Sequence, residues 1–283
     1  MNYIIITDTH FTSACSTRVG DYLSQLLTKF EYVVKVTNSL DAQLLHAGDF
    51  FDKPTAPDLV KSRLIPLLQS LKRPLIVIPG NHDRLYNSDD YIERTSLYLL
   101  QEAHLLRILQ PNEVITFDDS VVTTGRPLSI NSSLPVLALN HGFLNCDDGL
   151  SSFYLQDILT SSNLLLILGH DHVPYDQVCY KNATILRPGS FARAIRNEAA
   201  DRTPVMVHAY VNESKFHYKL LPIEVASPVQ LLFKPKSTPK KSDLSYDNLI
   251  NLIRSSVAEP SLEDSLKLVT TPEITSFILN KLD

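Results

Sequence analysis

The chain has 283 residues, of which 44% are hydrophobic and 20% charged, and its formal net charge is −5. This composition excludes a mainly disordered, collagen-like or coiled-coil architecture, and the length suits one large domain with a modest appendage. The three cysteines are widely spaced and form no CxxC pair, which argues against a disulfide framework or thiolate zinc site and for a reducing compartment. Without a signal-peptide pattern or an apolar stretch of about 20 residues, we expect a cytoplasmic protein that contacts no membrane.

The first half of the chain alternates short apolar runs with segments of helical periodicity. Continuous apolar runs bounded by polar residues are typical of strands that are buried on both faces. We expect strands at residues 3–7, 43–47 and 74–79 and helices at residues 21–36, 58–71 and 91–104. This β-α-β-α-β order favours a parallel sheet and an α/β fold.

The second half is richer in strands and ends in a segment of different composition. We expect strands at residues 114–117, 121–124, 135–140, 164–168, 184–187, 204–211 and 215–225, and a helix at 153–159. Residues 226–243 carry prolines and lysines that indicate a solvated linker, and residues 244–283 show helical spacing. We therefore expect one domain at residues 1–225, and a helical C-terminal segment that either packs back on it or docks a partner.

Five of the expected strands end in short clusters of carboxylate, amide and imidazole side chains. The clusters read DTH at 8–10, GDFFD at 48–52, GNHD at 80–83, NHG at 140–142 and GHDH at 169–172. In an open α/β sheet, ligands bind in the loops at the carboxyl ends of the parallel strands. One such cluster is common by chance, but five in the same chain indicate a shared site.

The donor types in these clusters point to divalent metal ions. The candidate ligands are Asp8, His10, Asp49, Asn81, His141, His170 and His172. Oxygen and imidazole donors without thiolates suit Mn²⁺, Fe²⁺ or Zn²⁺, and Mn²⁺ is our first choice. Seven ligands are too many for one ion with an open position, so we expect two ions about 3.5–4 Å apart, with a bridging carboxylate for which Asp49 is the natural candidate.

Two further residues of these clusters are candidates for proton transfer. His82 directly follows Asn81, so it lies close to the expected metals. Asp52 is on the same loop as Asp49, and a carboxylate beside an imidazole fixes its tautomer and supports its protonated form. We therefore interpret His82 as a general acid that Asp52 orients.

The order D-x-H, GDxxD, GNHD, H and GHxH resembles the calcineurin-like metallophosphoesterases over residues 8–172. The resemblance implies a four-layer sandwich of two mixed β-sheets flanked by helices. It also implies that a metal-bridging hydroxide attacks a phosphoester and that His82 protonates the leaving oxygen. By the same resemblance, one ion would bind Asp8, His10, Asp49 and His172, and the other Asp49, Asn81, His141 and His170.

Within this superfamily, the segments GDFFDKP at 48–54 and IPGNHD at 78–83 resemble the SbcD-type DNA repair nucleases, the nuclease subunits of SbcCD and MRN complexes. The segment RPGSFAR at 187–193 is similar to a PGS-x-x-R element of that branch. Protein serine/threonine phosphatases have Arg-Gly after GDxxD, whereas Lys53-Pro54 follows here. Two departures are Asp171 inside GHDH and a chain after residue 225 that is short for a capping domain.

The resemblance to this branch implies an exonuclease or endonuclease that acts on DNA in repair or end processing. It implies an SbcC-like coiled-coil ATPase as a partner of residues 244–283, and it allows a homodimer. A nuclease needs residues that contact the phosphate backbone, and our candidates are Arg84, Arg187 and Arg193, although ion-paired surface arginines are an equal alternative.

Two other functions remain open from the sequence. One is a phosphodiesterase or phosphatase for small molecules such as nucleotides or cyclic nucleotides, on the same fold. The other is a non-catalytic scaffold, as in the retromer subunit with this fold. The complete set of ligands and His82 argues against the scaffold, because a degenerate site usually loses some of them.

Overall fold

A computed structural model describes residues 1–111, 113–124, 129–130, 132–143, 159–160, 163–194, 202–226 and 233. The chain divides into a compact unit, Met1–Lys234, and a second unit, Pro235–Asp283, which lies outside the described residues. The expected helices within 244–283 therefore lie outside them, as do the expected linker at 226–243 apart from Ala226 and Phe233 and the expected helix at 153–159 apart from Leu159. Among the described residues, no helix is both long and apolar enough to cross a membrane.

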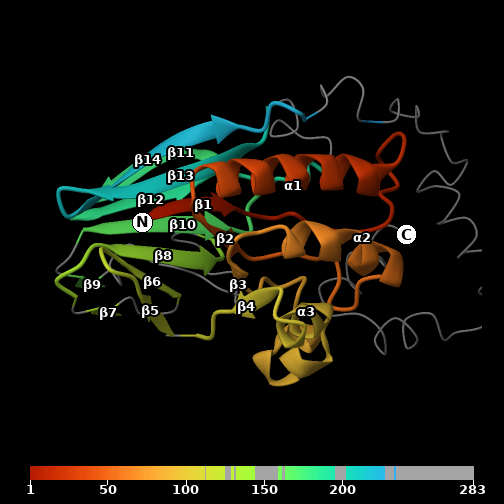
Figure 1. Ribbon diagram of the computed structural model, residues 1–283, viewed down its shortest axis with the longest axis horizontal. Coiled ribbons are helices and arrows are strands. Elements are labelled where there is room, and N and C mark those ends of the chain that lie inside the picture. The colour runs from red at the N-terminus through yellow and green to blue at the C-terminus, as the bar shows by residue number, and fades with distance from the viewer. Residues whose placement is uncertain are drawn as a thin grey trace, which may run out of the picture. The chain divides into compact units, whose positions relative to one another are not determined.

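The first unit is built on two six-stranded mixed sheets (Figure 1), which confirms the expected α/β architecture. In the first sheet, four parallel strands are followed at one edge by an antiparallel pair. Its order is β14 (Lys215–Pro222), β13 (Val205–Asn212), β1 (Asn2–Ile6), β2 (Gln43–Ala47), β3 (Leu75–Ile78) and β4 (Leu106–Ile108).

The second sheet has four parallel central strands and one antiparallel strand at each edge. Its order is β11 (Tyr175–Tyr180), β12 (Ala183–Arg187), β10 (Leu164–Gly169), β8 (Val136–His141), β6 (Val121–Thr124) and β5 (Val114–Thr116). Two short strands, β7 (Ser129–Ile130) and β9 (Leu159–Thr160), pair with each other separately.

Side chains along the strands of the first sheet point alternately into two hydrophobic cores. In β1, Tyr3 and Ile5 belong to the core between the two sheets, whereas Ile4 and Ile6 belong to the core under the helices. This is the period of two that a strand imposes on its side chains. Because both faces are buried, the strand is apolar from Tyr3 to Ile6, as the sequence predicts.

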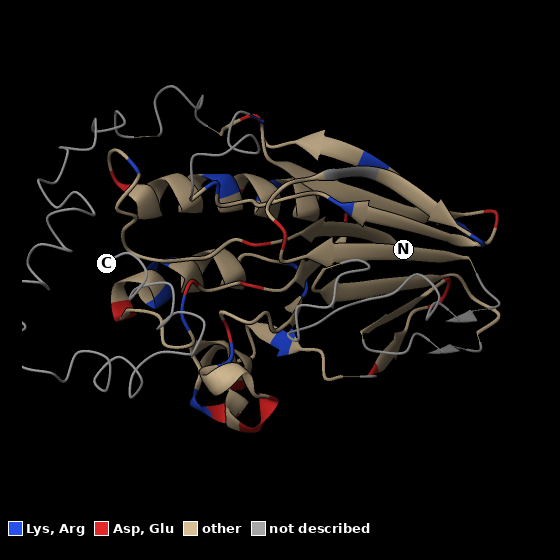
Figure 2. Cartoon of the chain, turned by 180° about the vertical axis from the view of Figure 1, so that it is seen from behind, with Lys and Arg blue, Asp and Glu red and all other residues tan. Residues whose placement is uncertain are grey.

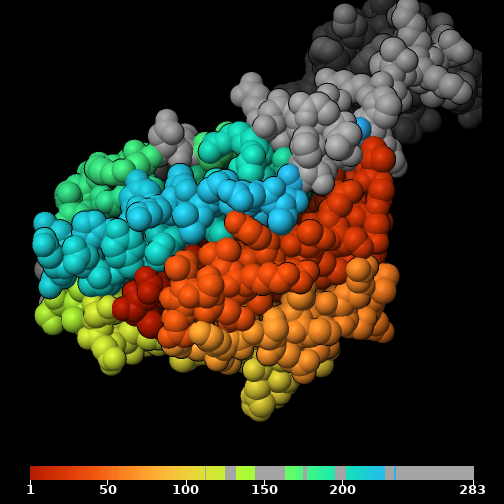
Figure 3. All heavy atoms as spheres, turned by 45° about the horizontal axis from the view of Figure 1, so that its top comes forward, coloured from red at the N-terminus to blue at the C-terminus, as the bar shows by residue number. Residues whose placement is uncertain are grey.

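The helices cover the outer face of the first sheet. They are α1 (Tyr22–Ser39), α2 (Asp58–Gln69) and α3 (Ser96–Glu102). Figure 3 shows α1 and α2 side by side on this face of the unit, and buried residues such as Phe30 and Leu64 seal them against the sheet. The described residues thus form three layers, namely the helices and the two sheets.

One expected element has a different form. The single helix expected at 91–104 is a 3₁₀ segment at Asp89–Arg94 followed by α3, so this prediction is wrong at its start. The break is at Thr95, which is extended and whose hydroxyl accepts a hydrogen bond from the Tyr98 backbone N–H at 3.3 Å. A threonine in this role begins a helix, because it satisfies a backbone donor that the helix leaves unpaired.

Candidate metal centre

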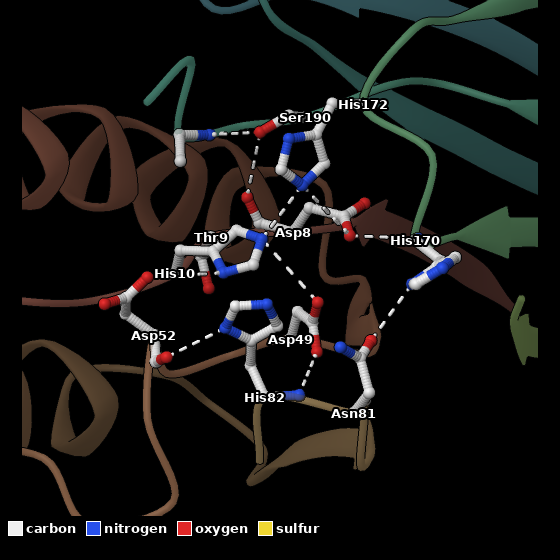
Figure 4. A network of polar contacts seen from close by, with 12 residues as sticks. Asp8, Thr9, His10, Asp49, Asp52, Asn81, His82, His170, His172 and Ser190 are labelled. Atoms are coloured by element: carbon white, nitrogen blue, oxygen red, sulfur yellow. Dashed lines mark hydrogen bonds and ion pairs between the residues drawn. The ribbon is translucent and has the colours of Figure 1, made fainter. Parts of the chain in front are cut away.

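All seven candidate ligands lie in one place, at the carboxyl ends of strands from both sheets. Asp8 and His10 follow β1, Asp49 follows β2 and Asn81 follows β3; His141 ends β8, and His170 and His172 follow β10. Figure 4 shows most of these side chains pointing toward one another, and Figure 2 shows acidic residues in the loops where strands end. The grouping expected from the strand-end clusters is therefore present in the fold.

The loops after β1 and β2 run side by side and hold each other in register. The backbone N–H groups of Asp8, His10 and Phe11 donate to the carbonyls of Gly48, Asp49 and Phe50 at 3.1, 3.0 and 2.9 Å. The ladder of the parallel sheet thus continues past the ends of its strands. The carboxylates of Asp8 and Asp49 consequently have fixed relative positions before any metal binds.

Four of the seven candidate ligands have a left-handed backbone. The φ angles of Asp8, His10, Asp49 and His170 are 52°, 43°, 56° and 91°. Residues other than glycine seldom adopt such angles, and they cost about 1–3 kcal/mol each where they occur. This concentration of unfavourable backbone conformations is typical of a functional site, where side-chain direction outweighs local stability.

Two glycines allow the ligands to approach the backbone. A Cβ atom on Gly48 would lie 2.2 Å from Nδ1 of His141, and one on Gly80 would lie 2.0 Å from Oδ1 of Asp49. Gly48 also has a φ of +90°, which suits glycine. The glycines of the GD and GN pairs are therefore required by close packing against ligand side chains.

Asp8, His10 and His172 form the first cluster of ligand atoms. Nε2 of His10 lies 3.0 Å from Nε2 of His172, and Nε2 of His172 lies 4.0 Å from a carboxylate oxygen of Asp8. Burial lowers the pKa of His10 to about 3, so its imidazole is neutral at physiological pH. A neutral imidazole is the form that binds metal ions.

Asn81, His141 and His170 form the second cluster around the amide oxygen of Asn81. Nε2 of His141 and Nδ1 of His170 lie 3.1 and 3.0 Å from this oxygen. Nδ1 of His141 donates to the carbonyl of Ala47 at 3.0 Å, which leaves Nε2 without the proton in the neutral ring. In the neutral ring, the lone pair of Nε2 therefore faces the oxygens of Asn81 and Asp49. These three acceptor atoms repel one another, and a proton or a metal ion between them would relieve the repulsion.

Asp49 lies between the two clusters. Its Oδ2 atom is 3.6 Å from Nε2 of His10 and 3.2 Å from Nε2 of His141, while Oδ1 accepts a hydrogen bond from the His82 backbone N–H at 2.9 Å. Burial lowers the pKa of His141, but the hydrogen bond and charge of Asp49 outweigh it and raise that pKa to about 9. A proton on His141 thus takes the place of a cation in the metal-free chain.

The site fits a pair of divalent cations on the chemistry of its own residues. Asp8 and Asp49 are 0% and 2% exposed, and no lysine or arginine among the described residues pairs with either carboxylate. Oδ2 of Asp8 and Nδ1 of His10 are buried and accept or donate no hydrogen bond within the described part of the chain. Buried charges require a partner, and bound metal ions would supply it.

His82 is exposed and lies beside the first cluster. Its ring stands edge-to-face with that of His10, with 4.7 Å between centroids, and its Nδ1 donates to the backbone carbonyl of Asp52 at 2.8 Å. Asp52 therefore orients His82 through its main chain and not through its carboxylate, which lies 3.9 Å from Nδ1 of His10. His82 and Asp52 are therefore in contact as expected, but the contact is made by the backbone carbonyl of Asp52 and not by its carboxylate.

The segment Pro188–Gly189–Ser190, part of the RPGSFAR stretch that resembles the nuclease branch, links the loops of two ligands. The backbone N–H of Ser190 donates to the carbonyl of His172 at 3.2 Å, and its hydroxyl donates to the carbonyl of Asp8 at 3.3 Å. The next carbonyls accept hydrogen bonds from buried basic side chains: Lys29 donates to Phe191, and Arg18 donates to Ala192 and Arg193. This loop therefore connects the two sheets at the site.

Asp83 has no role predicted from the sequence, yet its carboxylate joins two of the ligand loops. It is 1% exposed and accepts three backbone hydrogen bonds of 2.9 to 3.0 Å, from Phe50, Phe51 and Gly80. Burial and the charge of Asp49 raise its pKa to about 6. The only sequence signal is its place in the GNHD cluster.

We expect Asp83→Asn to destabilise the protein. The new amide puts an N–H group opposite a backbone donor, which costs about 2 kcal/mol, or a fall in Tm of roughly 4–8 °C. Thermal unfolding of the metal-free protein measures this, with exposed Asp41→Asn as the matched control. Equal Tm values for the two variants would show that the carboxylate does not hold the loops together.

The three arginines expected to contact phosphate are already engaged with protein oxygens. Arg84 Nε bonds Asp89 at 2.6 Å, and Arg187, whose side chain is 5% exposed, bonds Asp171 at 2.6 Å. Arg193 is buried and donates to the carbonyl of Arg202 at 3.2 Å. Asp171, the departure within GHDH, thus anchors the histidine loop to β12, and the phosphate role of the arginines stays a prediction.

Two solved structures are distantly similar to the chain. The 5'-nucleotidase of Candida albicans SC5314 is 12% identical with a TM-score of 0.44, over 90% of this chain and 57% of that one. The 5'-nucleotidase precursor of Thermus thermophilus is 12% identical with a TM-score of 0.45, over 81% of this chain and 56% of that one. The chain thus spans less than two thirds of either protein, and no curated protein sequence matches it.

The family model for the calcineurin-like phosphoesterases matches residues 1–174. This range contains β1, β2, β3, β8 and β10 and all seven candidate ligands. The match agrees with two mixed sheets and with Asp and His clusters that fit a binuclear metal site. The chain therefore belongs to the calcineurin-like phosphoesterase family and has the site of a metal-dependent phosphoesterase.

Proposed function

We propose that this chain is a two-metal phosphodiesterase that cleaves DNA, as the SbcD-type nucleases do. The observation that carries the proposal is the placing of Asp49 between two ligand clusters, with His82 exposed at their edge. Asp8, His10, Asp49 and His172 would hold one ion, and Asp49, Asn81, His141 and His170 the other. When bound, the two ions would polarise a phosphoryl oxygen and activate water as a nucleophile.

His82 is the residue that would protonate the leaving oxygen. Because its Nδ1 donates to a carbonyl, the proton available for transfer is on Nε2, at the opposite side of the ring. The carbonyl of Asp52 holds the ring in place. A ring nitrogen at this position can donate a proton to the leaving oxygen as the phosphorus–oxygen bond breaks.

Two observations support DNA as the substrate. The segments GDFFDKP, IPGNHD and RPGSFAR resemble those of SbcD-type nucleases, and the last of them is built into the site through Ser190. His82 is exposed, so a polymer that crosses the surface can present a phosphodiester to it. The proposal includes Mn²⁺ as the metal, whereas an ATPase partner for residues 244–283 stays a prediction.

The test is a cleavage assay with the purified chain and Mn²⁺. Labelled single-stranded and duplex DNA are compared with a cyclic nucleotide and a phosphomonoester, each with and without EDTA. We expect DNA cleavage that EDTA abolishes and added Mn²⁺ restores. Intact DNA with turnover of the small esters would replace this proposal with a small-molecule phosphoesterase. Metal binding without any hydrolysis would indicate a scaffold.

A further inference from the structure

The most exposed large apolar side chain among the described residues lies four positions after His82. Tyr86 is 83% exposed, and its backbone is left-handed, with φ 54° and ψ 25°. A bulky residue rarely adopts this conformation. The backbone of Tyr86 is therefore unfavourable, and because its ring is exposed to solvent, burial of the ring does not compensate for that cost. Such a feature suggests a binding role.

A second tyrosine and an arginine support the ring of Tyr86. The rings of Tyr86 and Tyr91 are 5.4 Å apart at an interplanar angle of 80°. The guanidinium of Arg94 lies over the ring of Tyr91, 5.4 Å from its centroid. Tyr91 is accordingly the more covered of the two, at 37% exposure, and Tyr86 keeps the open surface.

The tyrosine pair is tied to the loop that carries His82. The backbone N–H of Arg84 donates to the carbonyl of Asn81 at 3.4 Å, and the Arg84 side chain pairs with Asp89. Tyr86 is four positions after His82, and four residues span at most about 14 Å even when fully extended. The ring therefore lies within reach of the nucleotides that flank a phosphate placed at His82.

The charge of this segment indicates which part of a nucleotide it would bind. Residues 84–94 contain two arginines and three acidic residues, and one arginine is already ion-paired; Figure 2 shows this mixture of charges beyond the strand ends. The segment thus has no excess of positive charge with which to hold phosphates. Stacking of a base on an aromatic face needs none.

We propose that Tyr86, supported by Tyr91, is a stacking platform for a nucleobase next to the scissile phosphate. This deepens the proposed function and rests on it. An unpaired base is the ligand, because a base inside a duplex has both faces covered by its neighbours. The site therefore selects single strands or frayed ends, which gives the enzyme a preference that the metal centre alone does not supply.

The experiment compares Tyr86→Ala, Tyr86→Phe and a control, Leu99→Ala, which removes another exposed apolar side chain. Single-stranded oligonucleotides are cleaved with either a normal base or an abasic site beside the cleaved bond. We expect Tyr86→Ala to lose roughly 5- to 100-fold in kcat/KM, mostly through KM, on the normal substrate only. Tyr86→Phe and Leu99→Ala should cleave both substrates as the wild type does.

Binding provides a readout that does not depend on cleavage. In EDTA, an oligonucleotide with 2-aminopurine should lose fluorescence on binding the wild type and Tyr86→Phe, because stacking quenches it, but not on binding Tyr86→Ala. Equal quenching by all variants, or an equal loss on abasic and normal substrates, would overturn the inference. If the wild type cleaves no DNA, the proposed function fails, whereas quenching that requires Tyr86 would still support the stacking site.

Discussion

His82→Ala should keep its metal ions and lose about 10²- to 10⁴-fold in the rate of phosphodiester cleavage, the range for a lost general acid. The ring makes no contact with the Asn81 oxygen, where the second cluster gathers, and the backbone N–H of His82 that bonds Asp49 is unchanged by the substitution. Metal analysis of the purified variant and single-turnover cleavage of DNA measure the two parts of this prediction.

The loss should depend on the leaving group. The p-nitrophenolate group of a p-nitrophenyl diester leaves readily without a proton. Hydrolysis of such a diester should therefore slow much less in His82→Ala than cleavage of DNA does. Asp52→Asn is the matched control, because it keeps the backbone carbonyl that orients His82 and so should retain most of the activity. Equal losses for good and poor leaving groups, or loss of metal, would show that His82 is not the acid.

Asp49→Ala should lower the metal content much more than His82→Ala does, because it should weaken binding of both ions. Its carboxylate is the only one among the described residues that lies within 3.6 Å of ligand nitrogens from both clusters. Loss of residues that merely support ligands weakens metal binding about 10–100-fold, so loss of a shared ligand should exceed that range. Metal analysis after dialysis measures this, with Asp41→Asn as the control.

A comparison with His172→Ala sharpens this prediction. His172 belongs to the first cluster alone, so its removal should weaken one ion and leave the other bound. Asp49→Ala should therefore retain less metal than His172→Ala. If Asp49→Ala keeps one full equivalent, the carboxylate serves a single ion and another group must bridge the pair.

Much of the fold can be predicted from local sequence patterns. Strand β3 is found at Leu75–Ile78, within the expected run at 74–79, because a strand buried on both faces has apolar residues at nearly every position. Strand β11 was not expected, because this edge strand, YDQVCY, mixes polar and apolar residues. Pairing with β12, which no local pattern reveals, defines it.

The site could be predicted where chemistry follows the end of a strand. Asp8 and Asn81 were found in this way, since the topology brings such ends together. The backbone contacts could not be found: nothing in the residue type of Asp52 shows that its carbonyl, and not its carboxylate, holds His82. Asp83 likewise acts through backbone N–H groups that only the folded loops bring to it.

Each ligand cluster draws side chains from both sheets, and this has a consequence for the whole unit. His172 of the second sheet meets Asp8 and His10 of the first, and His141 meets Asn81 in the same way. Bound ions would therefore crosslink the two sheets, and the strength of metal binding would depend on how the sheets pack against each other. A cavity made among Leu45, Leu137 and Ile167, none of which is a ligand, should therefore weaken metal binding.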